Sequence, residues 1–217
     1  MELTWALQRS SMAVVIAAFW AAVALAQSDQ APAPTYNVGD RWTFDRLVPP
    51  DRREPWVDVV REVTPDGVVV GKNGRKFSPV FNPLDQAGRE IPLLRFPLAV
   101  GNSWDHAHDW SSPTGNLKTT TSLSYKVVGI EDVTVPAGTF RAYRLQSRGF
   151  VKDRSTITPI PSDARAEENY WYAPAVKRIV KYEGKHVKWV SPQWVVTWDL
   201  RYEMTGYQLA PQASVGN

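Results

Sequence analysis

An alternating run near the C-terminus constrains the fold of this chain most strongly. Apolar residues occupy every second position from Trp194 to Met204 and alternate with mostly polar residues such as Thr197. A period of two is typical of a β-strand with one buried face and one solvated face. We therefore expect the apolar face of this strand to lie in a core, with inward side chains at Trp194, Trp198, Leu200 and Tyr202.

Turn-forming residues divide the rest of the chain into short strands. Pro65-Asp66-Gly67 separates the alternating valines of 57–63 from the run 68–70, which predicts a β-hairpin. Helices are not expected, because the chain has 17 prolines and only 163–168 contains several good helix formers. Alternation and the content of aromatic and β-branched residues predict further strands at 42–44, 123–127, 139–149, 170–172 and 177–182.

These strands predict an all-β domain with antiparallel meander topology, because short turns join strands that are neighbours in sequence. About eight to ten strands would form a curved sheet, a half-barrel or a closed barrel. We expect a single domain over residues 36–209, since the chain has 12% aromatic and 43% hydrophobic residues for its core. VGDRW at 38–42 is similar to VGNSW at 100–104, but five residues do not establish a duplication.

The first 26 residues have the features of a cleavable export signal. Arg9 precedes the uncharged apolar run 12–22, and Ala24-Leu25-Ala26 has the pattern of a signal peptidase site. We expect cleavage between Ala26 and Gln27 and a periplasmic or secreted protein, with a retained N-terminal anchor as the alternative. Residues 27–35 are expected to be a flexible linker and residues 210–217 a tail. No later apolar run is long enough to span a membrane.

Composition excludes several classes of function. The chain has no cysteine, which excludes disulfides, a thiol nucleophile and cysteine-bound zinc, and it has only three histidines. A net charge of +3, together with the expected export, argues against a nucleic-acid partner. The sequence contains neither a glycine-rich phosphate loop nor a nucleophile elbow, so we predict no cofactor and no catalytic residue.

Three stretches together resemble a known group of proteins: FPLAVGNSW (96–104), VTVPAGTFRAYRL (133–145) and YWYAPAVKRIVKYE (170–183). Over residues 36–209 the chain is similar to exported proteobacterial proteins of the TapB-like and other domain-of-unknown-function families. The resemblance implies a periplasmic β-domain and brings no reaction or catalytic residues. Independently of it, Pro136 and Gly138 predict a turn between two strands.

The densest polar cluster of the sequence is Asp105-His106-Ala107-His108-Asp109. On an extended strand His106 and His108 would share a face, a spacing that metal sites use. A zinc or copper site would still need a third ligand, such as His186 or a remote carboxylate. The alternative is a solvated loop that binds nothing.

Aromatic residues provide the candidate ligand-binding surface. Consecutive aromatics at 170–172 cover both faces of one strand, so one face contacts the core and the other a loop, a ligand or a partner. The basic cluster 177–188 next to Trp189 suggests anionic lipid or polysaccharide binding, or else a solvated hairpin face. We predict these ligand contacts: Trp104, Trp110, Tyr170, Trp171, Tyr172 and Trp189.

Three functional hypotheses follow from the sequence. The aromatic excess and the missing catalytic motifs favour a non-catalytic envelope protein that binds an apolar or glycan ligand, or an assembly partner. The cluster 105–109 supports, as the alternative, a metal-dependent or hydrolytic enzyme acting on envelope material. The third hypothesis is a purely structural subunit. Glu167 and Glu168 do not strengthen the enzyme hypothesis, because adjacent strand residues point to opposite faces and we expect both to be solvated.

Overall fold

The computed structural model describes residues 30–48, 52–70, 74–157 and 162–211, and the predicted export signal lies outside these ranges. Within them no helix is long and apolar enough to cross a membrane. One short 3-10 helix, η1 (Pro174–Val176), accompanies the following strands: β1 (Gln30–Ala31), β2 (Arg41–Val48), β3 (Arg52–Thr64), β4 (Gly67–Val70), β5 (Arg75–Phe77), β6 (Leu98–Ala99), β7 (Ser103–Ser111), β8 (Leu117–Val135), β9 (Gly138–Ser155), β10 (Ser162–Ala173), β11 (Arg178–Val190) and β12 (Gln193–Gln208).

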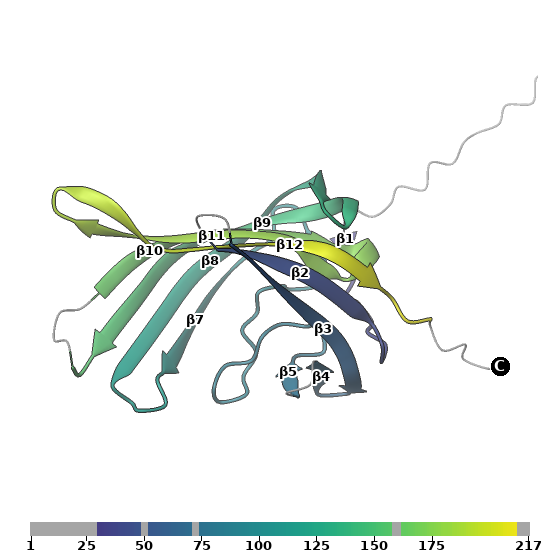
Figure 1. Ribbon diagram of the computed structural model, residues 1–217, viewed down its shortest axis with the longest axis horizontal. Coiled ribbons are helices and arrows are strands. Elements are labelled where there is room, and N and C mark those ends of the chain that lie inside the picture. Colours follow the sequence, from purple (N-terminus) through teal and green to yellow (C-terminus); the bar gives the residue numbers. More distant parts are fainter. Residues whose placement is uncertain (1–29, 49–51, 71–73, 158–161, 212–217) are drawn as a thin grey trace, which may run out of the picture.

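Ten strands form one antiparallel sheet in the order β5-β4-β3-β2-β12-β11-β10-β9-β8-β7. Two meanders, β2 to β5 and β7 to β12, are joined where β2 pairs with β12. The sheet curves strongly and stays open between its edge strands β5 and β7 (Figure 1). The predicted all-β meander is therefore confirmed, and the observed shape is an open half-barrel. Gln30 and Ala31, from the expected linker, form β1 and pair with β6.

A β-bulge corrects the alternation predicted for β12. In the pairing with β11, Thr197 is an extra residue between Val196 and Trp198. The apolar residues at even positions before Thr197 therefore point to the opposite face of the sheet from those at even positions after it. Trp194 is 49% exposed, so its predicted core position was wrong. The residues after the bulge are buried or partly buried against the core: Trp198, Leu200, Tyr202 and Met204.

The hairpin predicted around Pro65-Asp66-Gly67 is present as β3 and β4. Asp58 and Val60 are buried, whereas Val57 and Val63 are exposed. The valine alternation therefore does not mark the buried face of β3, which contains a buried acidic residue.

The predicted strand at 170–172 is the C-terminal end of a longer one. β10 begins at Ser162, so residues 163–168, which contain several good helix formers, are part of a strand. Both long neighbours, β9 and β11, pair with β10 along most of its length. Tertiary pairing therefore outweighs the weak local helix propensity of this segment.

Residues 78–97, between β5 and β6, pack against the concave face of the sheet. Asn82 is fully buried and holds this segment together, because its Nδ2 donates to the Leu94 oxygen (2.7 Å) and its Oδ1 accepts from the Leu94 nitrogen (2.8 Å). The Trp104 Nε1 donates to the Pro92 oxygen at 2.7 Å, which fastens the segment to β7. The segment therefore acts as a partial filling of the half-barrel.

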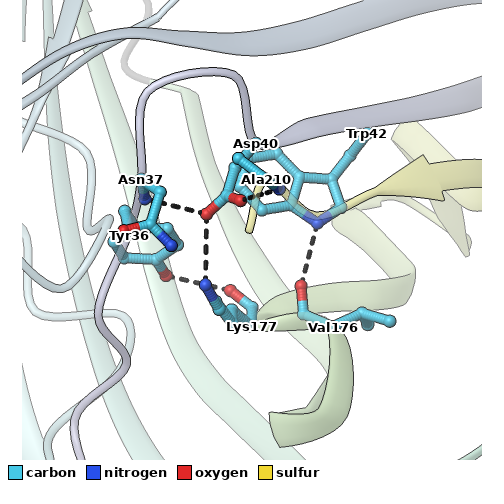
Figure 2. A network of polar contacts seen from close by, with 7 residues as sticks. All are labelled: Tyr36, Asn37, Asp40, Trp42, Val176, Lys177 and Ala210. Carbon is cyan, nitrogen blue, oxygen red and sulfur yellow. Dashed lines mark hydrogen bonds and ion pairs between the residues drawn. The ribbon is translucent and has the colours of Figure 1, made fainter. Parts of the chain in front are cut away.

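A buried network around Asp40 ties both ends of the domain to η1 (Figure 2). The Asp40 carboxylate is inaccessible and accepts hydrogen bonds from the backbone nitrogens of Asn37 (3.0 Å) and Ala210 (2.8 Å). It also pairs with Lys177 Nζ at 3.2 Å. Close by, Trp42 Nε1 donates to the Val176 oxygen at 2.8 Å. These contacts fix β2 and the end of β12 to the same 3-10 turn.

Candidate functional site

The concave face contains a hollow of about 390 Å³ beside the segment 78–97. Alternate residues of β8, β10, β11 and β12 line it, and Ile91 and Leu93 contribute from the segment. Most of the remaining lining is aliphatic or aromatic, with examples at Leu123, Val151 and Leu200. A cavity of this size with apolar walls and a few convergent polar groups is typical of a small-molecule site.

Glu168 is the polar centre of the hollow, although the residue is only 8% exposed. Its Oε2 accepts hydrogen bonds from Ser147 Oγ (2.7 Å) and from the Tyr170 hydroxyl. Its Oε1 accepts from the Tyr182 hydroxyl (3.2 Å), and His186 Nε2 lies 3.8 Å from the same oxygen. Hydroxyl donors of this kind offset the cost of burying a carboxylate.

The strand register explains how these groups meet. Glu168 of β10 lies directly opposite Ser147 of β9 on one side and Gly184 of β11 on the other. A side chain at Gly184 would collide with the Tyr182 hydroxyl and approach the Trp198 ring. Glycine therefore leaves the space that Tyr182 needs to reach the carboxylate.

Burial and hydrogen bonding act in opposite directions on the pKa of Glu168. Burial alone would raise this pKa, but His186 and the hydroxyls of Tyr170, Ser147 and Tyr182 lower it below the ordinary value. Burial raises the pKa of Tyr170 and of Tyr182, and the charge of Glu168 raises both further. At neutral pH the hollow therefore holds an ionised carboxylate and neutral phenols.

Glu168→Gln is expected to destabilise the protein in a pH-dependent way. Because folding lowers the pKa of Glu168, its ionisation stabilises the folded state above the unfolded pKa of about 4.3. This contribution is lost as the pH falls through the lower folded value, so the difference between wild type and variant should shrink below about pH 4. Urea unfolding of both proteins between about pH 7 and pH 3 measures this difference. A difference that does not change with pH would contradict the prediction.

Aromatic rings extend from the hollow across β12. Tyr182 stacks with Tyr202 at 5.1 Å between ring centroids, and Tyr202 meets Trp56 edge-on at 5.3 Å. Trp56 and Tyr202 line a second hollow of about 730 Å³. Leu200 lines both hollows, so they adjoin across β12. The concave face therefore offers a trough with aromatic rings along it, with Glu168 toward one end and charged side chains such as Arg46 and Glu54 in the lining of the other.

His106 and His108 lie on strand β7 and not in the solvated loop that the sequence left as the alternative. Their rings share one face, stacked at 5.4 Å between centroids, and His108 lines the hollow. Burial is the largest cause of the lowered pKa of each imidazole. Within the described residues, no group of three or more His, Cys, Asp or Glu side chains is placed to hold a metal ion. Metal binding by this pair stays a prediction.

Three of the six predicted ligand contacts lie on the concave face. Tyr170 lines the hollow itself. Trp104 is buried and stacks on Tyr125 with centroids 5.5 Å apart. Tyr172 is buried and meets Phe96 edge-on. Trp104 and Tyr172 therefore support the surroundings of the hollow, and of these three only Tyr170 contributes to its described lining.

The other three predicted contacts are separate from one another. Trp171 faces away from Tyr170 and donates from Nε1 to Glu131 Oε1 at 2.6 Å. Trp110 is 42% exposed near the end of β7, and Trp189 is 52% exposed in the β11–β12 hairpin. The structure therefore does not bring the six residues together into one surface, and ligand contact by each stays a prediction.

The expectation that Glu168 is solvated was wrong, whereas Glu167 is exposed as expected. One sequence signal could have identified Glu168. It is the single acidic residue on a strand face that it shares with Ala166, Tyr170 and Tyr172. Its partners lie on other strands, and only the register brings them together. The sequence analysis did not identify Ser147 and Tyr182 as partners of Glu168, or Trp198 as part of the same hollow, and it considered His186 only as a possible metal ligand.

The basic cluster 177–188 does not form one solvated face. Lys177 pairs with the buried Asp40, and Arg178 pairs with the buried Asp58 at 2.7 Å. The Arg178 guanidinium also lies 3.8 Å from the centroid of the Phe81 ring. The first two members of the cluster are therefore structural, because they neutralise buried carboxylates.

Comparison with known proteins gives no family assignment. No protein-family model matches the chain, and no curated protein matches it. A candidate lipoprotein of Parabacteroides distasonis is 11% identical, with a TM-score of 0.44 over 82% of this chain and 97% of that one. A candidate exported protein of Bacteroides fragilis with a YmcC-like fold is 13% identical, with a TM-score of 0.41 over 82% and 99%. The hypothetical lipoprotein YmcC of Escherichia coli is 13% identical, with a TM-score of 0.42 over 79% and 85%.

Proposed function

We propose that this protein is an exported, non-catalytic binder of an amphiphilic molecule, whose apolar chain lies in the trough on the concave face. The N-terminal segment ending at Ala26 would direct the chain to the periplasm or out of the cell. The observation that carries the proposal is the hollow around Glu168, which combines apolar walls with one charged centre. Such a combination fits a ligand that has both an apolar part and a polar head.

Two features of the fold support binding over a purely structural role. The half-barrel is open, and the segment 78–97 covers only part of its inner face, which leaves the two adjoining hollows. Aromatic side chains such as Tyr182 and Trp198 give the trough apolar walls with hydrogen-bonding tips.

A hydrolytic enzyme is the alternative that a specific contact favours. Glu168 and His186 face each other in the hollow with 3.8 Å between Oε1 and Nε2, and both groups can transfer protons. Ser147 donates its hydroxyl to Glu168, but it is buried and is not among the described residues that line the hollow, so it is not placed to attack a bound ligand. Turnover of a bound amphiphile, followed by mass spectrometry of the ligand, would favour this alternative.

The binding proposal predicts that substitutions at two neighbouring residues of β8 have different effects on ligand affinity. Thr121 lines the hollow, whereas its neighbour Thr120 bonds to Asp109 on the other face of the sheet. Thr121→Phe should reduce the affinity for octyl glucoside, a neutral amphiphile, by about tenfold or more, because the added ring occupies the hollow. Thr120→Phe should leave the affinity unchanged. Isothermal titration calorimetry measures both variants.

A ligand carried through purification gives an independent measurement. Organic extraction of protein purified without detergent should release an apolar compound that mass spectrometry can identify. If nothing is extracted and octyl glucoside does not bind the wild-type protein, the binding proposal fails. Equal losses of affinity in the Thr120 and Thr121 variants would show that the bound molecule lies elsewhere.

A further inference from the structure

The hollow around Glu168 has an uneven balance of charge. Among the described residues that line it, Glu168 is the one carboxylate, and none is a lysine or an arginine. The imidazoles of His108 and His186 are the groups of this lining that can become positive. The head of a ligand that enters the hollow therefore meets a buried negative charge.

Aromatic rings surround this charge. Tyr170 lies 6.5 Å from Tyr125 and 4.9 Å from Tyr182, measured between ring centroids, and Tyr182 lies 6.4 Å from Trp198. All four rings line the hollow together with Glu168. A cation within about 6 Å of a ring centroid is attracted by the negative face of the ring, and cages of such rings bind quaternary ammonium groups.

We propose that the hollow selects amphiphiles whose polar head is an ammonium group. The ammonium lies against Glu168 within the aromatic cage, and the apolar chain extends along Leu123, Val151 and Leu200. This inference rests on the proposed function and adds the sign of the charge on the ligand head. Anionic amphiphiles such as fatty acids are disfavoured, because their carboxylate would lie close to that of Glu168.

The hydrogen bonds of Glu168 are compatible with this role. A carboxylate has about four acceptor positions, and Glu168 receives hydroxyl bonds from Ser147, Tyr170 and Tyr182. Its Oε1 takes only one of these three bonds, so that oxygen can form an ion pair with an ammonium group, beside His186 Nε2 at 3.8 Å. His186 and the same hydroxyls lower the pKa of Glu168 against the effect of burial, so the carboxylate is charged when a ligand arrives.

Three probes that share an eight-carbon chain test the sign of the head: octyltrimethylammonium, octyl glucoside and octanoate. Calorimetry is done at about pH 8, because a positive charge elsewhere in the hollow would mask that of Glu168 and burial lowers the pKa of His108. We expect octyltrimethylammonium to bind about tenfold tighter than octyl glucoside, and octanoate to bind most weakly. Equal affinity for all three overturns the ammonium inference but leaves the proposed function intact, whereas absence of binding by every probe overturns both.

Variants assign the preference to particular groups. In Glu168→Gln the preference for octyltrimethylammonium over octyl glucoside should fall to about threefold or less, while the affinity for octyl glucoside stays similar. Trp198→Leu removes one ring of the cage and keeps the carboxylate, so it should weaken binding of the cation more than binding of the glucoside. It also provides the test if Glu168→Gln does not fold.

Trp194→Leu, before the bulge, is the matched control and should change neither affinity. An unchanged preference in a folded Glu168 variant, or in the Trp198 variant, overturns the inference.

Discussion

Trp42→Ala is expected to lower the free energy of unfolding by roughly 3–5 kcal/mol. Trp42 is fully buried, and its ring meets those of Tyr36 and Phe81 edge-on, with centroids 6.0 Å and 5.7 Å away. Alanine would leave a cavity among these rings and would remove the hydrogen bond from Nε1 to the Val176 oxygen. Urea denaturation followed by circular dichroism measures the loss.

Trp194→Ala is the control, because it removes the same type of side chain from a half-exposed position before the bulge in β12. It should cost about 1 kcal/mol or less. Similar losses in the two variants would contradict the view that Trp42 is a central packing element and Trp194 is not.

Asp40→Ala is expected to destabilise the protein to a similar extent, by roughly 3–5 kcal/mol. The carboxylate is inaccessible, and its removal leaves Lys177, whose side chain is only 17% exposed, without its buried partner. The backbone nitrogens of Asn37 and Ala210 lose an acceptor at the same time (Figure 2). Removing one member of a buried ion pair is costly because the other charge remains desolvated. Thermal and urea unfolding measure the effect.

A second substitution identifies the cause of this loss. Lys177→Met in the Asp40→Ala background removes the unpaired charge, so the double variant should recover part of the lost stability. Asp163→Ala is the surface control, because Asp163 and its partner Arg154 are each about half exposed, and it should have little effect. A double variant no more stable than Asp40→Ala would show that the backbone hydrogen bonds, and not the ion pair, dominate the effect.

Most of the fold could be predicted from local patterns. The alternation at Leu123, Tyr125 and Val127 marked the buried face of β8, and Trp42 and Phe44 marked that of β2. These patterns succeed because a strand with one wet face must alternate. They fail at β-bulges, because one extra residue such as Thr197 changes which face of the sheet the following side chains point to. No local sequence pattern identifies such an extra residue.

Most of the candidate site could not be predicted from the sequence. Tyr170 was singled out as an aromatic residue, but the importance of Glu168 depends on hydroxyls from β9 and β11 that only the register places near it. Gly184 is a further example, because the room that it leaves lets Tyr182 reach Glu168, which only the register of β10 and β11 places opposite Gly184. Non-local pairing of this kind is not encoded in a short window of residues.

The pairing of β2 with β12 has a consequence for the order of folding. Arg41 lies opposite Gln208, so this contact closes nearly the whole described chain into one loop. Contacts between residues so far apart in sequence form late, because closing a long loop costs entropy before any pairing energy is gained. Strands β2 to β5 emerge first during synthesis, and β2 lacks its second neighbour until β12 follows. The topology therefore delays completion of the sheet until β12 has been synthesised and has paired with β2.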